Sequence, residues 1–226
     1  MKPASSFLHL FALLSVLLTT TGCHARYKKM AGRIGSVKPM VADPGLPVVN
    51  VDGVNDTNSS DTAVEGVLDA VVGVGLAVKA TKVQARLQRA VTPEDAAAVL
   101  HDGILGAPAK GQLPHRIGPK GRHEMEIRLV QYGVGINAFG PSLDTTVSVR
   151  IDRKRDGKRV YRASTTCTER LSDVSRIVLP GVEQVQALQA LTVVEEMKRA
   201  ELRDATLRGV ERCAHEVVER MVRHAR

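Results

Sequence analysis

Residues 142–168, SLDTTVSVRIDRKRDGKRVYRASTTCT, contain two runs of alternating side chains separated by Asp156-Gly157. Asp-Gly between two such runs is the strongest short-range signal for a tight β-hairpin. Alternate residues, which would point to the same side of the two strands, are mostly apolar or small. They are Leu143, Thr145, Val147, Val149, Ile151, Tyr161, Ala163, Thr165 and Cys167. We therefore predict two antiparallel strands that bury one face and leave the other face in water.

A third strand is predicted just before this hairpin, in EMEIRLVQYGVGINAF, residues 124–139. Its apolar residues have odd numbers as far as Leu129 and even numbers from Tyr132 onward, so the side of the strand that they would occupy changes between the two. An extra residue in a strand produces such a change, so we expect a β-bulge or a strand edge near Gly133 and Gly135.

Helical patterns flank the three strands. Residues 62–91 begin with the N-cap candidate Thr62 and read as a helix, with a kink or break expected near Gly73 and Gly75. A short second helix is predicted from Thr92, a glycine- and proline-rich loop over 106–123, and one or two helices after Pro180. The predicted fold is α+β: a small antiparallel sheet of three or four strands packed against a long C-terminal helix and one or two preceding helices.

The N-terminal residues have the pattern of an export signal. Residues 7–18, FLHLFALLSVLL, form an apolar run too short to span a membrane, and the small residues Thr21 and Gly22 lead to Cys23. This arrangement resembles the lipobox of bacterial lipoproteins, although Thr20 stands where leucine is usual. The resemblance implies a signal peptide at residues 1–22 and acyl chains, palmitate among them, on Cys23. An ordinary secretory signal cut nearby is the alternative.

The resemblance also implies a domain organisation and a location. Residues 23–61, rich in Pro, Gly, Asn and Asp, are predicted to be a lipid-anchored linker in which LPVVNV, residues 46–51, is a candidate short strand, and residues 62–226 a single periplasmic domain. His24 is not the aspartate that retains lipoproteins at the inner membrane, so we expect the outer membrane of a bacterial cell envelope, facing the periplasm. Arg26, Lys28, Lys29 and Arg33 lie next to the expected anchor, where each gains about 1 kcal/mol at an anionic lipid surface. A solvated stem is the alternative.

The charge and composition narrow the possible partners. The formal net charge is +8, but the chain has no tryptophan and only three tyrosines and three phenylalanines for stacking on bases. Export also separates the protein from nucleic acid, so we expect no nucleic-acid partner.

The three cysteines are predicted to have two roles. Cys167 lies on the apolar side of the last strand and Cys213 on the apolar side of the last helix, which must cover the sheet. In an exported chain this favours a disulfide between Cys167 and Cys213, leaving Cys23 for the lipid. Two separately buried thiols are the alternative.

We find no sequence signature of catalysis, and we expect no enzyme activity, metal or cofactor. The nucleophile-elbow, Walker and dinucleotide motifs are absent, and neither HEME (residues 123–126) nor HEVVE (residues 215–219) has the spacing of metal ligands. An envelope hydrolase with its site in the 106–123 loop is the alternative. It would require a pocket that gathers His115, His123 and an acidic residue.

The candidate binding site is the basic hairpin RIDRKRDGKRVYR, residues 150–162. Its cationic residues are Arg150, Arg153, Lys154, Arg155, Lys158, Arg159 and Arg162. They would suit anionic lipid headgroups, glycan phosphates or an acidic partner protein. A solvated hairpin whose charges prevent edge pairing is the alternative.

The lipobox, linker, small sheet with a basic hairpin and charged C-terminal helix (residues 200–222) together resemble the auxiliary lipoproteins of envelope ABC-type transport systems. The resemblance implies a noncatalytic accessory that binds partner proteins in the periplasm. We therefore predict a lipid-anchored binding or scaffolding module, accessory to a transport or envelope-assembly complex. Direct binding of an anionic lipid or glycan, and an envelope hydrolase, are the alternatives.

Overall fold

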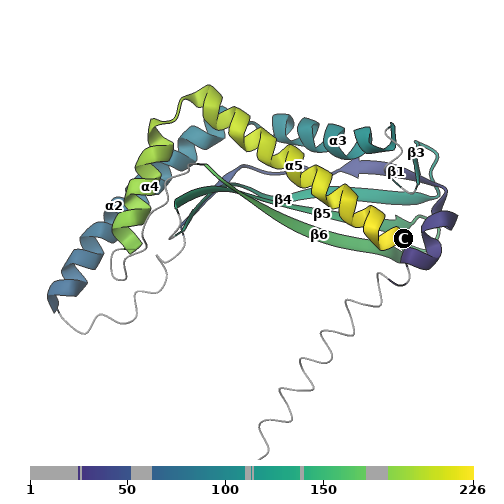
Figure 1. The fold of residues 1–226 in the computed structure, drawn as a ribbon, viewed down its shortest axis with the longest axis horizontal. Helices are drawn as coiled ribbons and strands as arrows, with labels where there is room; N and C mark the ends of the chain where they lie inside the picture. Colours follow the sequence, from purple (N-terminus) through teal and green to yellow (C-terminus); the bar gives the residue numbers. More distant parts are fainter. Residues whose placement is uncertain are drawn as a thin grey trace, which may run out of the picture.

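The structure, a computed structural model, describes residues 25, 27–51, 63–109, 113, 115–137, 140–171 and 183–226. Within these ranges helices cover one side of a long, curved sheet (Figure 1). The α+β class is therefore confirmed. Cys23 and the expected signal peptide lie outside the described residues.

The three predicted strands are present and are paired in sequence order. They are β4 (His123–Asn137), β5 (Gly140–Arg153) and β6 (Arg159–Arg170). Both pairings are antiparallel, with Val147 of β5 between Leu129 and Thr165. The register shifts between Leu129 and Gln131, so Val130 is an extra residue whose side chain is exposed. This bulge lies at Val130 and not at the expected Gly133 and Gly135, and it explains the change of parity that the sequence shows in β4.

The sheet is larger than predicted. Three further short strands are β1 (Ser36–Val41), β2 (Val48–Val51) and β3 (Arg116–Ile117). β1 and β2 both pair parallel with β4, and β3 pairs parallel with β1. The expectation of three or four strands in an antiparallel sheet is thus corrected to six strands in a mixed sheet.

Close backbone contact allows β2, which matches the candidate strand at residues 46–51, to pair with β4. A Cβ atom at Gly133 would lie 1.9 Å from the carbonyl oxygen of Val48, so glycine allows β2 to approach β4. β1 and β3 are too short to show an alternation that predicts them from the sequence. β1 and β2 also lie inside the predicted linker, so folded structure begins well before residue 62.

The predicted helices are confirmed as α2 (Ala63–Ala90), α3 (Pro93–Ala109), α4 (Glu183–Glu196) and α5 (Arg199–Ala225). Thr92 caps α3, because its Oγ1 accepts the Asp95 N–H at 3.2 Å. α2 continues without a break through Gly73 and Gly75, contrary to expectation. Among the described residues, no helix combines the length and apolar composition needed to cross a bilayer.

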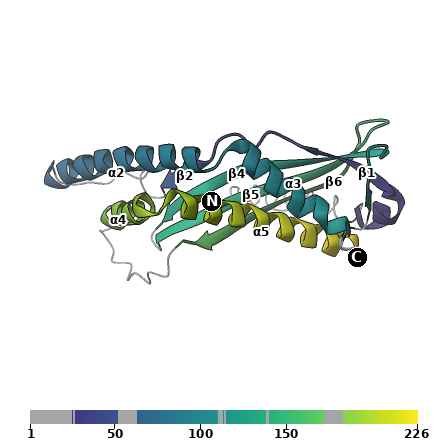
Figure 2. The same ribbon diagram turned by 90° about the horizontal axis from the view of Figure 1, so that it is seen from above.

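α3 and α5 lie side by side over one face of the sheet, as the view from above shows (Figure 2). The hydrophobic core forms between these helices and the sheet. On α5, Leu202, Val210, Val217 and Met221 are fully or almost fully buried. No described element covers the opposite face of β4, β5 and β6 (Figures 1 and 2). We call this surface the open face.

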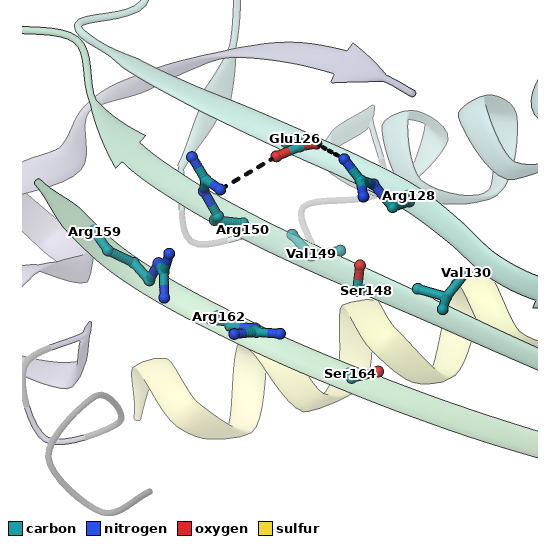
Figure 3. A pocket seen from close by; sticks show the side chains of 9 residues that line it. All are labelled: Glu126, Arg128, Val130, Ser148, Val149, Arg150, Arg159, Arg162 and Ser164. Carbon is teal, nitrogen blue, oxygen red and sulfur yellow. Dashed lines mark hydrogen bonds and ion pairs between the residues drawn. The ribbon is translucent and has the colours of Figure 1, made fainter. Parts of the chain in front are cut away.

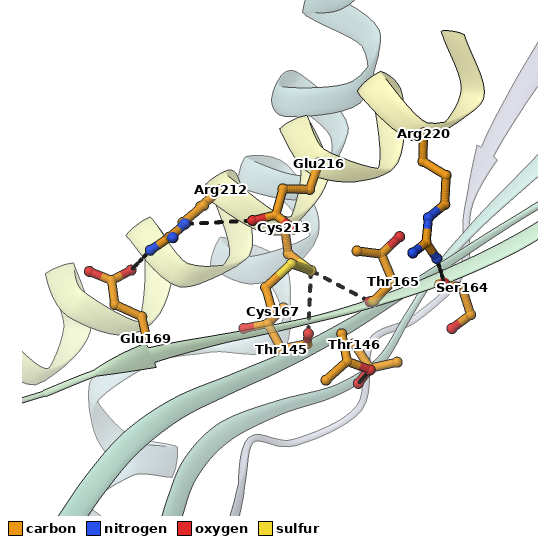
Figure 4. The surroundings of a disulfide bond; sticks show 11 residues. Thr145, Thr146, Ser164, Thr165, Cys167, Glu169, Arg212, Cys213, Glu216 and Arg220 are labelled. Atoms are coloured by element: carbon orange, nitrogen blue, oxygen red, sulfur yellow. Dashed lines mark hydrogen bonds and ion pairs between the residues drawn. A yellow bond between two sulfur atoms is a disulfide. The ribbon is translucent and has the colours of Figure 1, made fainter. Parts of the chain in front are cut away.

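A disulfide joins the helical layer to the sheet (Figure 4). It links Cys167 of β6 to Cys213 of α5, the pair predicted from the sequence. With both sulfurs bonded to each other, neither is a free nucleophile.

The two ends of the molecule differ. At one end α2 and α4 pack together and project beyond the sheet, forming what we call the arm (Figure 1). Lys79 Nζ ties the arm together through Thr192 Oγ1 at 2.6 Å and Glu195 Oε2 at 3.5 Å. The arm exposes Val74, Val78 and Val185.

At the other end, residues 27–34 form a short helix that lies against the core. Tyr27, Ala31 and Ile34 are buried at helical spacing, and the Tyr27 ring centroid is 4.1 Å from that of Tyr161. This segment, predicted to be linker, is therefore packed on the domain.

Candidate anion-binding surface

The hairpin places its seven predicted cationic residues in two groups. The first group surrounds the turn, where Gly157 adopts a φ of 63° and its N–H donates to the Arg153 carbonyl at 2.8 Å. Lys154, Arg155 and Lys158 are exposed there, whereas Arg153 forms an ion pair with Asp156 at 3.4 Å. The turn thus directs three unpaired cations into solvent at the end of the sheet.

The second group, Arg150, Arg159 and Arg162, lies on the open face. Together with Arg128, their guanidinium groups surround a hollow of about 380 Å³ (Figure 3). They come from β4, β5 and β6. The hollow is also lined by Glu126, Val130, Ser148, Val149 and Ser164.

The register of the strands builds this hollow. Glu126, Arg150 and Arg162 lie opposite one another across β4, β5 and β6, and Arg128, Ser148 and Ser164 form a second such row. Side chains of the same parity point to one face, so both rows lie on the open face. The small serines leave space between the longer arginines.

The lining of the hollow carries more positive than negative charge, with four arginines and one glutamate. Glu126 pairs with Arg128 at 2.8 Å and with Arg150 at 3.8 Å, and Arg150 also binds Asp152. The hydrogen bond and charge of Asp152 raise the pKa of Arg150. Arg159 and Arg162 form no ion pair with any described residue. Two guanidinium groups are therefore free to bind an added anion.

Arg128 was not among the residues predicted from the sequence, and the predicted set combined two separate groups. The sequence did carry a signal for Arg128, because it lies between Ile127 and Leu129 on the polar side of the predicted strand. The structure brings Arg150, Arg159 and Arg162 to the hollow and leaves Arg153, Lys154, Arg155 and Lys158 at the turn.

The two histidines of the alternative hydrolase site, His115 and His123, are not among the residues that line the hollow. His115 and His123 are buried, and no carboxylate forms an ion pair or hydrogen bond with either ring within the described residues. Tyr27 Oη lies 3.5 Å from His115 Nε2. Burial, with a smaller effect of His123, lowers the pKa of His115 to about 4. The described part of the chain also contains no group of three His, Cys, Asp or Glu residues that could hold a metal.

Burial also lowers the pKa of His123, and the charge of Arg153 adds to the effect. The Ile34 carbonyl opposes this lowering, although it lies outside hydrogen-bond geometry. The two imidazoles are thus held neutral within the core near the turn.

Comparisons with known proteins give only distant likenesses. No family model matches the chain, and no curated protein matches it. A DUF330 protein from Xanthomonas campestris is 10% identical, with 57% of this chain and 61% of that one covered and a TM-score of 0.38. The match thus spans less than two thirds of the Xanthomonas chain.

Two further solved structures are similar at the same level. A candidate lipoprotein from Caulobacter crescentus is 14% identical over 57% of this chain and 81% of that one, with a TM-score of 0.32. The PelC dodecamer from Paraburkholderia phytofirmans is 12% identical over 75% of this chain and 90% of that one, with a TM-score of 0.27. The likeness to transport auxiliary lipoproteins finds no support in these comparisons. All three TM-scores are below 0.5, so the functional argument rests on the residues of this chain.

Proposed function

We propose that this protein is a noncatalytic binding module of the bacterial envelope, anchored by lipid on Cys23, and that the hollow on its open face binds an acidic segment of a partner protein. The observation that carries the proposal is the pair Arg159 and Arg162. Both are exposed at the hollow and have no carboxylate partner among the described residues.

Carboxylates suit this surface because a guanidinium can donate two parallel hydrogen bonds to one carboxylate. Arg159 and Arg162 both line the hollow from β6, so neighbouring acidic side chains could engage the two guanidinium groups in succession. The hydroxyl groups of Ser148 and Ser164 line the same hollow and could donate further hydrogen bonds.

A protein segment fits the hollow better than a glycan does. No aromatic residue among those that the structure describes lines the hollow, so it offers no ring for a sugar to pack against. An extended acidic peptide needs only charge and hydrogen-bond donors along its length, and the hollow provides both.

The anchor and the location are part of this proposal. The apolar run ending in Thr21-Gly22-Cys23 supports export and lipidation. Residues 27–34 pack on the domain, so folded structure begins within four residues of Cys23 along the sequence. We expect the outer membrane, with the domain in the periplasm.

The test measures binding of a fluorescein-labelled hexaglutamate peptide to the full-length protein in detergent micelles. Arg159→Gln with Arg162→Gln should weaken binding about tenfold, because two charge-assisted contacts are lost. The matched control is Lys82→Gln with Arg208→Gln, which removes the same charge from exposed positions on α2 and α5. Equal weakening in both double variants would reduce the effect to net charge and refute a specific site.

A second experiment identifies the natural ligand in cells. A photo-crosslinking residue at Thr166, exposed beside the hollow, should yield a protein adduct whose crosslinked peptide is rich in Asp or Glu. The adduct should be lost in the Arg159→Gln, Arg162→Gln variant and retained in the control. Adducts to glycan alone would overturn the assignment of a protein partner.

A further inference from the structure

The end of the molecule that carries the hairpin turn is strongly cationic. Its exposed side chains include Lys28, Lys29, Arg122, Lys154, Arg155 and Lys158, which we call the basic end. They come from the helix at 27–34, the segment before β4 and the turn between β5 and β6. None of the six forms an ion pair with a described carboxylate.

Direct contacts hold these three segments together. The Lys154 N–H donates to the Arg122 carbonyl at 3.1 Å, which joins the turn to the start of β4. Tyr27 stacks on Tyr161, which joins the N-terminal helix to β6. The basic end is therefore one surface of the folded domain.

The position of this surface relative to Cys23 is limited by covalent geometry. Cys23 precedes Tyr27 by four residues, and a chain spans at most about 3.6 Å per residue. A lipid-modified Cys23 therefore lies within roughly 14 Å of Tyr27. The bilayer that receives the acyl chains must then lie beside the basic end.

We propose that the basic end is a docking surface for anionic phospholipid headgroups, which fixes the domain with this end on the bilayer. The inference rests on the lipid anchor proposed above. The attraction from an anionic surface decays within a Debye length of about 8 Å at physiological salt. The short connection between Cys23 and Tyr27 allows the cationic side chains of the basic end to come within this distance of the membrane. Several acyl chains on Cys23 would hold the protein at the membrane by themselves, so the polybasic surface would set the orientation of the domain rather than its attachment.

Docking in this orientation points the arm away from the membrane. The strands run along the length of the molecule, and β5 alone has 14 residues, which span roughly 45 Å (Figure 1). α2 and α4 lie at the far end of these strands. Val78 on the arm should therefore remain far from the headgroups while the turn touches them.

The experiment places one environment-sensitive fluorophore on the full-length, lipidated protein through a noncanonical amino acid, so that no cysteine is altered. The probe replaces either Arg155 or Val78, and the protein is reconstituted in phosphatidylethanolamine–phosphatidylglycerol vesicles containing a nitroxide-headgroup lipid. Quenching should be strong at position 155 and absent at position 78. It should fall at position 155 when phosphatidylcholine replaces the anionic lipid or when salt is raised.

Charge variants then separate docking from tethering. Lys28→Gln, Lys29→Gln, Lys154→Gln and Lys158→Gln together should lower the ratio of docked to undocked protein by about 10²-fold or more at low salt. Lys82→Gln, Arg89→Gln, Lys198→Gln and Arg208→Gln form the matched control, with the same change of charge at exposed positions away from the basic end.

Vesicle flotation shows which proposal fails. Flotation that depends on Cys23, with equal quenching at positions 155 and 78, would overturn docking and retain the anchor. Equal flotation of Cys23→Ser and the parent would refute the lipid anchor. Quenching at position 155 that is unchanged by the four substitutions would also overturn electrostatic docking.

Discussion

At the scale of single residues, the two buried histidines near the turn make the stability of the domain depend on pH. His115 contacts the Tyr27 hydroxyl and lies near His123, and no carboxylate of the described residues is placed to stabilise a proton on its ring. Burial therefore favours the neutral imidazole of the folded state. An unfolded chain binds this proton at an ordinary pKa.

Acidification is thus predicted to destabilise the domain. Between the unfolded pKa of 6.5 and the folded pKa of about 4, the unfolded state binds more protons, so the free energy of unfolding falls as the pH falls. The contribution of His115 amounts to about 3 kcal/mol over this interval. His123 acts in the same direction.

Urea unfolding at several pH values between 7 and 4 measures this effect. His115→Gln should flatten the dependence on pH, whatever its effect on stability at pH 7. A slope in His115→Gln equal to that of the parent would contradict the prediction.

At the scale of elements, the disulfide fixes α5 to the edge strand β6. In the chain-entropy model, closing the 46-residue separation between Cys167 and Cys213 contributes about 4 kcal/mol to stability. Replacing both cysteines by alanine should therefore lower the free energy of unfolding by about that amount.

Chemical denaturation of the double variant checks the magnitude, and thiol alkylation of the denatured, unreduced parent checks the bond. Neither Cys167 nor Cys213 should be alkylated before reduction. Labelling of both would mean that the two thiols are buried separately.

The N-terminal helix at 27–34 depends on one aromatic anchor. Tyr27 is fully buried between His115 and Tyr161, and burial raises its pKa. Tyr27→Ala should cost about 3–5 kcal/mol, the usual loss for a buried aromatic side chain.

Limited proteolysis is the measurement for this helix. Cleavage after Lys28, Lys29 or Arg33 should accelerate in Tyr27→Ala and remain slow in Tyr27→Phe, which keeps the ring. Equal cleavage of the parent and Tyr27→Ala would show that the helix does not need this contact.

At the scale of the whole molecule, the structure has two asymmetries, between the covered and open faces and between the basic end and the arm. β5 lies between two strands beneath α5, whereas α4 lies in the arm and exposes Val185. Local stability follows such differences in burial and hydrogen bonding.

Hydrogen–deuterium exchange should reflect this difference. We expect amides of β5 residues 145–151 to exchange at least about tenfold more slowly than those of α4 residues 185–194. Peptide-level mass spectrometry measures both segments in one experiment. Equal protection would mean that the arm and the sheet unfold together.

The sequence alone predicted the three central strands, the two helices before them, helical structure after Pro180, the irregularity in β4 and the favoured cysteine pairing. Each depends on local alternation, on capping or on the side of an element on which a residue lies. The sequence also identified the hairpin as the main source of positive charge.

Only the tertiary structure decided which charges act together. Arg128 joins Arg150, Arg159 and Arg162 because three strands align in register, and the hairpin turn joins Lys28 and Lys29 because Tyr27 packs on Tyr161. The short strands β1, β2 and β3 likewise depend on long-range pairing with little local signal. Contacts between residues distant in sequence set these features, and no single segment contains the information to specify them.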